Sequence, residues 1–180
     1  MEKSIATPKK TKKILREHNI RLNKRLGQNF LIDPNIIDII IDTAEIKGNE
    51  TILEIGPGIG SLTEYLLESI NNGKVIAVEK DNRFIEILKE QFENEVKNEQ
   101  LKLINDDVLN IKWNEFLKDC EKEVKVLANL PYYITTPVIM GLLESSYKFT
   151  SLIFMVQKEV AERMVSEPGT KAFGSLSVAV

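Results

Sequence analysis

The stretch Thr51-Ile52-Leu53-Glu54-Ile55-Gly56-Pro57-Gly58-Ile59-Gly60 decides the fold of this 180-residue chain. Its first five residues are mostly apolar and predict a short buried strand. The three glycines at alternate positions predict a sharp turn at which the backbone can come close to a ligand. Residues 61–69 follow with helical character. A strand, a glycine turn and a helix in succession are typical of an α/β protein with a parallel sheet.

The same alternation continues along the chain. Strands are expected at residues 74–78, 101–104, 125–128, 151–156 and 176–180, and helices at 34–47, 84–92, 136–144 and 158–165. We therefore predict an α/β fold with a mostly parallel sheet and helices on both faces. Because the apolar, β-branched segment 176–180 stands at the chain end, the sheet is expected to be truncated before its last strand or strands.

Composition limits the class of protein. The chain is 43% hydrophobic and 28% charged, which is ordinary for a globular domain with a core. It has no apolar run of the roughly 18 residues that a membrane span requires, and no secretory signal. The single cysteine, Cys120, suits a reducing compartment, and no Cys/His cluster suggests a metal. We expect a cytoplasmic protein without a membrane or metal partner.

Charge is spread unevenly. Residues 1–25 contain nine Lys or Arg and two acids, so this segment carries +7 and the remainder −10. Such a basic arm is typical of contact with a polyanion, and a solvated tail is the alternative. Residues 1–13 lack apolar periodicity and are expected without fixed structure, with a helical turn or two at 14–20. We assign 1–25 as a basic arm and 26–180 as one domain.

Polar groups follow the predicted strands at the ends where parallel sheets bind ligands. The glycine turn departs from the dinucleotide fingerprint, because Ser61 stands where its third glycine would be and Pro57 removes an N–H donor. Glu79 can accept both hydroxyls of a ribose, and Asp107 can accept an adenine amino group. Together they indicate an adenosyl ligand without phosphate. Individually, the glycines can form only a tight turn and Glu79 can be an exposed acid at a strand end. Asp106, beside Asp107, can be a turn residue or a helix cap.

The stretch Val126-Leu127-Ala128-Asn129-Leu130-Pro131-Tyr132-Tyr133 starts as a buried strand and ends in groups that a strand does not need. The amide oxygen of Asn129, the carbonyl of Leu130 and the ring of Tyr132 can hold a planar molecule that carries an amino group. Pro131 fixes the backbone between them. The alternative is a strand-end turn with a core tyrosine.

These motifs resemble those of a known class of enzyme. Residues 54–60 resemble motif I of class I S-adenosylmethionine methyltransferases, and Glu79 resembles their ribose-binding acid. Residues 129–132 resemble the four-residue motif of amino-group methyltransferases. The segments 26–31, 129–137 and 157–163 are similar to the KsgA/RsmA family, the ribosomal RNA small-subunit adenine N6,N6-dimethyltransferases. The resemblance covers the chain from about residue 14 to its end.

The resemblance implies a Rossmann-like class I methyltransferase fold, S-adenosylmethionine as cofactor, and dimethylation of two adjacent adenosines in a 16S ribosomal RNA hairpin. It implies an immature small ribosomal subunit as partner, a monomer, and a C-terminal helical domain that is absent here. The implied cofactor contacts are Asn29, Leu31, Gly56, Gly58, Glu79, Asp107 and Asn129, and the implied catalytic residues are Asn129, Leu130, Pro131 and Tyr132.

Three alternatives remain open. The first is the resistance-type relative that methylates an adenine of 23S ribosomal RNA; residues 26–31 and 135–137 favour the small-subunit branch instead. The second is a non-catalytic RNA-binding assembly factor that uses residues 9–25, against which the intact Asn129, Tyr132 and Glu79 argue. The third is a nucleotide-dependent oxidoreductase, which Ser61 disfavours.

Overall fold

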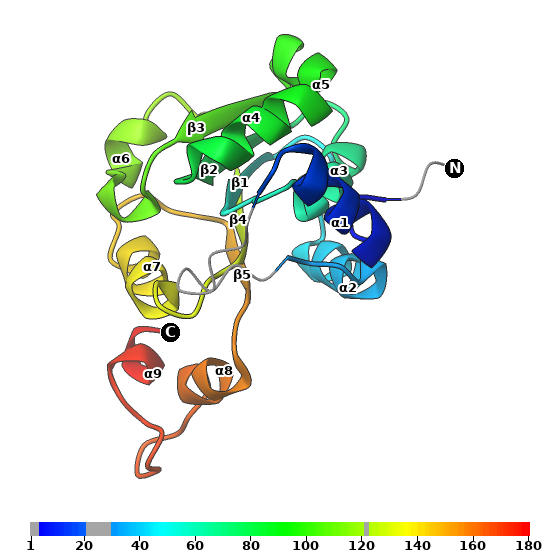
Figure 1. The fold of residues 1–180 in the computed structure, drawn as a ribbon. Coiled ribbons are helices and arrows are strands. Elements are labelled where there is room, and N and C mark those ends of the chain that lie inside the picture. The colour runs from blue at the N-terminus through cyan, green and yellow to red at the C-terminus, as the bar shows by residue number, and fades with distance from the viewer. Residues whose placement is uncertain (1–3, 21–29, 121–122) are drawn as a thin grey trace.

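One parallel sheet of five strands forms the centre of the molecule, with helices on both of its faces (Figure 1). This computed structural model describes residues 4–20, 30–120 and 123–180. The strand order is β3-β2-β1-β4-β5, and the strands are β1 (Thr51–Ile55), β2 (Lys74–Glu79), β3 (Leu101–Asn105), β4 (Val124–Asn129) and β5 (Ser151–Met155). The predicted fold class is confirmed, and all five of these strands were anticipated.

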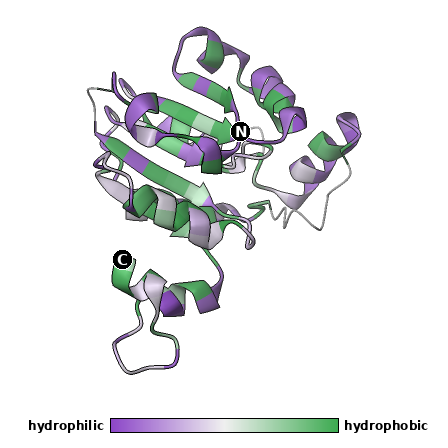
Figure 2. Cartoon of the chain, turned by 90° about the vertical axis from the view of Figure 1, so that its left-hand side faces the viewer, coloured by the Kyte–Doolittle hydropathy of each residue, from purple (hydrophilic) through white to green (hydrophobic). Residues whose placement is uncertain are grey.

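Two hydrophobic cores hold the helices against the sheet. The helices are α1 (Pro8–Glu17), α2 (Pro34–Ala44), α3 (Ser61–Ser69), α4 (Asn82–Gln91), α5 (Glu93–Lys97), η2 (Val108–Asn110), α6 (Trp113–Phe116), α7 (Thr135–Leu143), α8 (Lys158–Met164) and α9 (Ser175–Ala179). In β1, Ile52 packs towards α1 to α4, whereas Leu53 and Ile55 pack towards η2, α6, α7 and α9. Figure 2 shows strands that are largely hydrophobic, as burial on both faces requires.

The register of the sheet aligns the strand ends that matter for function. Ile55 pairs with Val78 on one side and with Ala128 on the other, and Glu79 pairs with Asn105. The segments that follow β1 to β4 therefore leave the sheet on the same side, at the carboxyl ends of the strands. Among the described residues, no helix is long and apolar enough to span a membrane.

The prediction of a strand at residues 176–180 is wrong, because this segment forms helix α9. Leu176 is fully buried against the core that includes α7, while Val178 and Val180 are exposed. The backbone N–H of Gly174 donates to Ser177 Oγ, which caps the helix start. The burial of Leu176 and the helix cap thus outweigh the β-branched composition of the segment. This is possible because β-propensity reflects packing against neighbouring strands more than an intrinsic preference of the residues.

The expectation that residues 1–13 lack fixed structure is also wrong for the part that the structure describes. Helix α1 begins at Pro8, with Thr7 as its N-cap, and Ile5 and Ala6 are buried. The carboxylate of Glu64 in α3 accepts hydrogen bonds from Ser4 Oγ at 2.6 Å and from Ile5 N at 2.9 Å. Thr7-Pro8 is a helix-start signal that the charge of the segment obscured. The division between an arm at 1–25 and a domain at 26–180 stays a prediction.

Candidate functional site

A cleft of about 690 Å³ opens at the carboxyl ends of the strands. It gathers the following residues that the sequence predicted as site residues: Leu31, Gly56, Gly58, Glu79, Asp107, Asn129, Leu130, Pro131 and Tyr132. Asn29, the remaining predicted contact, lies outside the described residues. The cleft forms because five parallel strands end at one edge, and its volume lies in the usual range for small-molecule sites.

The glycine turn connects β1 to α3 through backbone conformations that favour glycine. Gly56, Gly58 and Gly60 have φ angles of +71°, +58° and +89°. Gly56 N–H donates to Val78 O at 2.9 Å, which fastens the turn to β2. A side chain on Gly58 would meet the ring of Phe30 at 3.1 Å. At Gly56 and Gly58 the turn therefore presents main-chain atoms, without side chains, to the cleft.

Gly60→Ala is expected to lower the free energy of unfolding by about 2–5 kcal/mol, by combining left-handed strain with overpacking. A Cβ there would lie 2.6 Å from a ring carbon of Phe92. Gly56→Ala is the matched control, because its φ is also positive but no atom lies within 4 Å of the added Cβ. The control is expected to lose about 1–2 kcal/mol. Urea unfolding measures both, and equal losses would contradict the packing constraint at Gly60.

Glu79 closes β2 and binds the glycine turn. Its Oε2 accepts from Gly58 N at 3.1 Å, and its Oε1 accepts from Asp81 N at 2.8 Å. Burial raises the pKa of Glu79, although the two backbone N–H groups act in the opposite direction. Each oxygen can accept further hydrogen bonds. The side chain is therefore fixed at the cleft wall with acceptor capacity for ligand hydroxyls.

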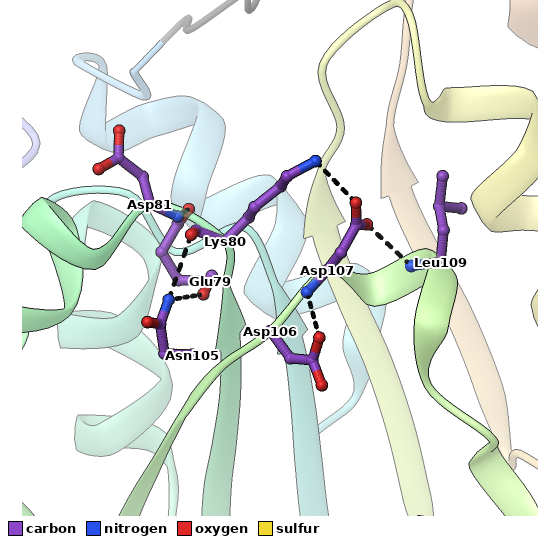
Figure 3. A network of polar contacts seen from close by, with 7 residues as sticks. All are labelled: Glu79, Lys80, Asp81, Asn105, Asp106, Asp107 and Leu109. Atoms are coloured by element: carbon purple, nitrogen blue, oxygen red, sulfur yellow. Dashed lines mark hydrogen bonds and ion pairs between the residues drawn. The ribbon is translucent and has the colours of Figure 1, made fainter.

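Asp107 lies beside Glu79 at the end of the neighbouring strand (Figure 3). Its Oδ2 is 2.7 Å from Lys80 Nζ, and its Oδ1 accepts from Leu109 N at 3.1 Å. Hydrogen bonding to Lys80 is the largest cause that lowers the pKa of Asp107, which keeps this carboxylate an acceptor. Asp107 also caps η2, a role that the sequence had suggested for its neighbour Asp106 instead.

Two polar residues of this region have roles that the sequence pattern did not predict. Asn105 Nδ2 donates to Glu79 O at 2.9 Å and to Lys80 O at 3.2 Å, and so joins the ends of β2 and β3 (Figure 3). Lys80 pairs with Asp107 across the same gap. The only sequence signal was their position at strand ends, because both contacts join residues more than 20 positions apart.

The segment after β4 forms the other side of the cleft. Asn129 is the last residue of β4, and Leu130 is buried, with its N–H donating to Met155 O of β5 at 3.3 Å. The carbonyl of Pro131 accepts from Thr135 Oγ1 at 3.0 Å, which closes the turn into α7. Tyr132 is 54% exposed, so the interpretation as a core tyrosine is wrong. The amide of Asn129, the turn at Pro131 and the accessible ring of Tyr132 therefore lie along one wall of the cleft.

Comparison with known proteins agrees with this architecture. Residues 19–180 match the family model described as ribosomal RNA adenine dimethylase. The chain is 52% identical over its whole length to ribosomal RNA small subunit methyltransferase A of Halothermothrix orenii, and 48% identical over 98% of its length to the protein of that name from Streptococcus thermophilus. It spans 59% and 60% of the lengths of these curated relatives.

Solved structures of ribosomal RNA methyltransferases and related enzymes are also similar to this chain. A dimethyladenosine transferase from Plasmodium falciparum is 33% identical with a TM-score of 0.67, covering 82% of this chain and 50% of that one. The 23S rRNA methyltransferase ErmE is 27% identical with a TM-score of 0.62, covering 75% of this chain and 50% of that one. The family model alone matches well over half of the residues. The chain belongs to the ribosomal RNA adenine dimethylase family.

Proposed function

We propose that this chain is the catalytic part of an enzyme that transfers methyl groups from S-adenosylmethionine to N6 of two adjacent adenosines in 16S ribosomal RNA of the immature small subunit. The observation that carries the proposal is the division of one cleft into two sides. Glu79 and Asp107 line one side, and residues 129–132 line the other. The names of the relatives, which refer to the small subunit, support the choice of RNA.

The cofactor side fits an adenosyl group. Glu79 offers carboxylate oxygens to the ribose hydroxyls, and Asp107 offers an ionised acceptor to the adenine amino group. The positive-φ glycines leave room for the ligand beside the turn, and Leu31 adds an apolar contact. We assign Gly56, Gly58 and Asn129 to the same ligand. S-adenosylmethionine supplies a methyl group that is activated on a sulfonium centre.

The other side fits the target base. The adenine N6 lone pair is delocalised into the ring, so N6 is a weak nucleophile. The Asn129 amide oxygen and the Leu130 carbonyl accept its two N–H bonds and orient the lone pair towards the methyl group. Pro131 holds this backbone, and stacking of Tyr132 on the base contributes about 1–3 kcal/mol. Orientation and electrostatics provide the acceleration, and no strong base is required.

A second candidate is methylation of an adenine in 23S ribosomal RNA, which the similarity to ErmE favours. The higher identity to relatives named for the small subunit supports the first candidate. A cytoplasmic location, which the single Cys120 favours, and a monomeric state, which the family resemblance implies, complete the proposal.

Two measurements test the proposal. Isothermal calorimetry with S-adenosylhomocysteine is expected to give saturable binding at micromolar to millimolar ligand. Transfer of a labelled methyl group is expected to label unmodified small subunits rather than large subunits, with the product identified as N6,N6-dimethyladenosine. Labelling of large-subunit RNA would favour the second candidate. Absence of any ligand binding would contradict the assignment of the cofactor side.

A further inference from the structure

Glu54 of β1 is a buried carboxyl group that has no role in the methyl transfer proposed for this cleft. The residue lines the cleft, yet it is only 2% exposed. Its Oε2 accepts a hydrogen bond from Thr63 Oγ1 of α3 at 2.7 Å. An ionised carboxylate can accept about four hydrogen bonds. One neutral hydroxyl does not replace the hydration that a buried negative charge loses.

The surroundings of Glu54 favour its neutral form. Burial is the largest cause that raises the pKa of Glu54 to about 8. The hydrogen bond from Thr63 lowers this pKa, and the negative charge of Glu79 on β2 raises it. Ala77 and Leu127, its register partners on β2 and β4, are apolar, and Thr63 on α3 does not titrate near neutral pH. At pH 7 the side chain is therefore mostly a carboxylic acid in the ligand-free protein.

The strand order decides which part of a ligand lies over Glu54. β1 stands between β2, which carries Glu79, and β4, which carries Asn129. A ligand whose nucleoside lies at the ends of β2 and β3, and whose reacting group faces Asn129, must cross the end of β1. In the cofactor assigned above, the portion beyond the ribose is an α-amino acid. In such a ligand the ammonium group would lie over the end of β1, within reach of Glu54, which lines the cleft there.

Ser61 provides a second observation in the same cleft. It is the first residue of α3, it lines the cleft, and it is 4% exposed. Its hydroxyl is buried without a hydrogen-bond partner in the structure. A helix N-terminus favours an anion, and an unused hydroxyl can donate to one. A buried acid and an unused donor that line the same cleft suit the ammonium and carboxylate groups of an amino acid.

We propose that Glu54 is a carboxylic acid in the ligand-free protein and ionises when the α-ammonium group of the cofactor arrives, so that cofactor binding releases a proton. This inference rests on the proposed function, because it assumes a ligand with an adenosyl and an amino acid part. The O–H bond of Glu54 breaks, its proton passes to the buffer, and the carboxylate pairs with the ammonium group. No electrons are exchanged.

Calorimetry tests this proposal with two ligands. S-adenosylhomocysteine and 5′-deoxy-5′-methylthioadenosine carry the same nucleoside, but only the first carries the amino acid. Titrations at pH 7 in phosphate and in Tris, whose ionisation enthalpies differ widely, give the number of protons released. We expect nearly one proton with S-adenosylhomocysteine and almost none with methylthioadenosine. The release should fade as pH rises through about 8, where Glu54 already loses its proton in the free protein.

Glu54→Gln is the matched variant, because glutamine has the shape of the neutral acid and keeps the fold. It is expected to lose the proton release and to bind S-adenosylhomocysteine about 10- to 100-fold more weakly, as loss of a charge-assisted hydrogen bond implies. Binding of S-adenosylhomocysteine without proton release, or equal release with both ligands, would overturn the inference and leave the proposed function standing. Failure of both ligands to bind would instead refute the cofactor assignment itself.

Discussion

Asn129→Ala is expected to slow methyl transfer to the adenine N6 by roughly 10²–10³-fold, the usual cost of removing one preorganised polar group from a reaction site. The change deletes the amide oxygen that orients N6, but it leaves β4 and the buried Leu130 in place. Single-turnover transfer of a labelled methyl group to unmodified small subunits, at saturating S-adenosylmethionine, measures the chemical step apart from the contact of Asn129 with the cofactor. The affinity for the target RNA should change far less than this rate.

Asn105→Ala is the matched control, because Asn105 is also an asparagine at the end of a strand that reaches this edge. Its amide donates to Glu79 O and Lys80 O and so supports the cofactor side. We expect weaker binding of S-adenosylhomocysteine with a much smaller loss in the single-turnover rate. An unchanged rate in Asn129→Ala, or the same kinetic profile in both variants, would contradict the assignment of Asn129 to the target base.

The parts of the site that the sequence predicted are those that follow from strand periodicity. Once β1 to β4 are recognised as parallel strands, their carboxyl ends must share one edge, and the residues that follow them meet there. That reasoning placed Gly56, Glu79, Asp107 and Asn129 in one cleft without any coordinates, and the cleft contains all four. Topology thus determines which residues meet, because it depends on pattern rather than on detailed packing.

The features that the sequence did not predict depend on side-chain geometry or on burial in the tertiary structure. The contact of Lys80 with Asp107 joins residues 27 positions apart and has no periodic signal. Helix α9 forms from a β-branched segment because Leu176 gains a buried position there. The raised pKa of Glu54 follows from its burial, which a motif does not reveal. Such features follow from packing, which is non-local along the chain.

Lys125→Met is expected to lower the free energy of unfolding by about 3–5 kcal/mol, since it leaves a buried carboxylate unpaired. Lys125 Nζ lies 3.0 Å from Glu50 Oε1, and these side chains are only 7% and 2% exposed. The ammonium group also donates to Ala44 O and Glu45 O at the end of α2. Urea unfolding measures the loss. Lys102→Met on the exposed side of β3 is the control, and it should cost under about 1 kcal/mol.

The pH dependence of stability provides an independent check on Glu50. Burial by itself raises its pKa, but hydrogen bonds from Lys47 N and Lys125 outweigh burial and lower the pKa to about 2. A folded-state pKa below the ordinary value of 4.5 means that this stabilisation is complete above about pH 4.5 and is lost as pH falls towards 2. Over that window the group contributes about 3 kcal/mol. Glu50→Gln should remove this part of the acid transition.

The position of this ion pair separates its effect from that of Asn129. Lys125 lies near the start of β4 and Asn129 is its last residue. The ion pair is therefore at the amino ends of the strands, whereas the cleft opens at their carboxyl ends. Lys125→Met should therefore unfold at lower urea concentration yet bind S-adenosylhomocysteine with nearly unchanged affinity while it remains folded. Combining it with Glu50→Gln should recover part of the lost stability, because no buried charge then lacks a partner. A loss of ligand affinity that equals the loss of stability would contradict this separation, since it would mean that the ion pair also shapes the cleft.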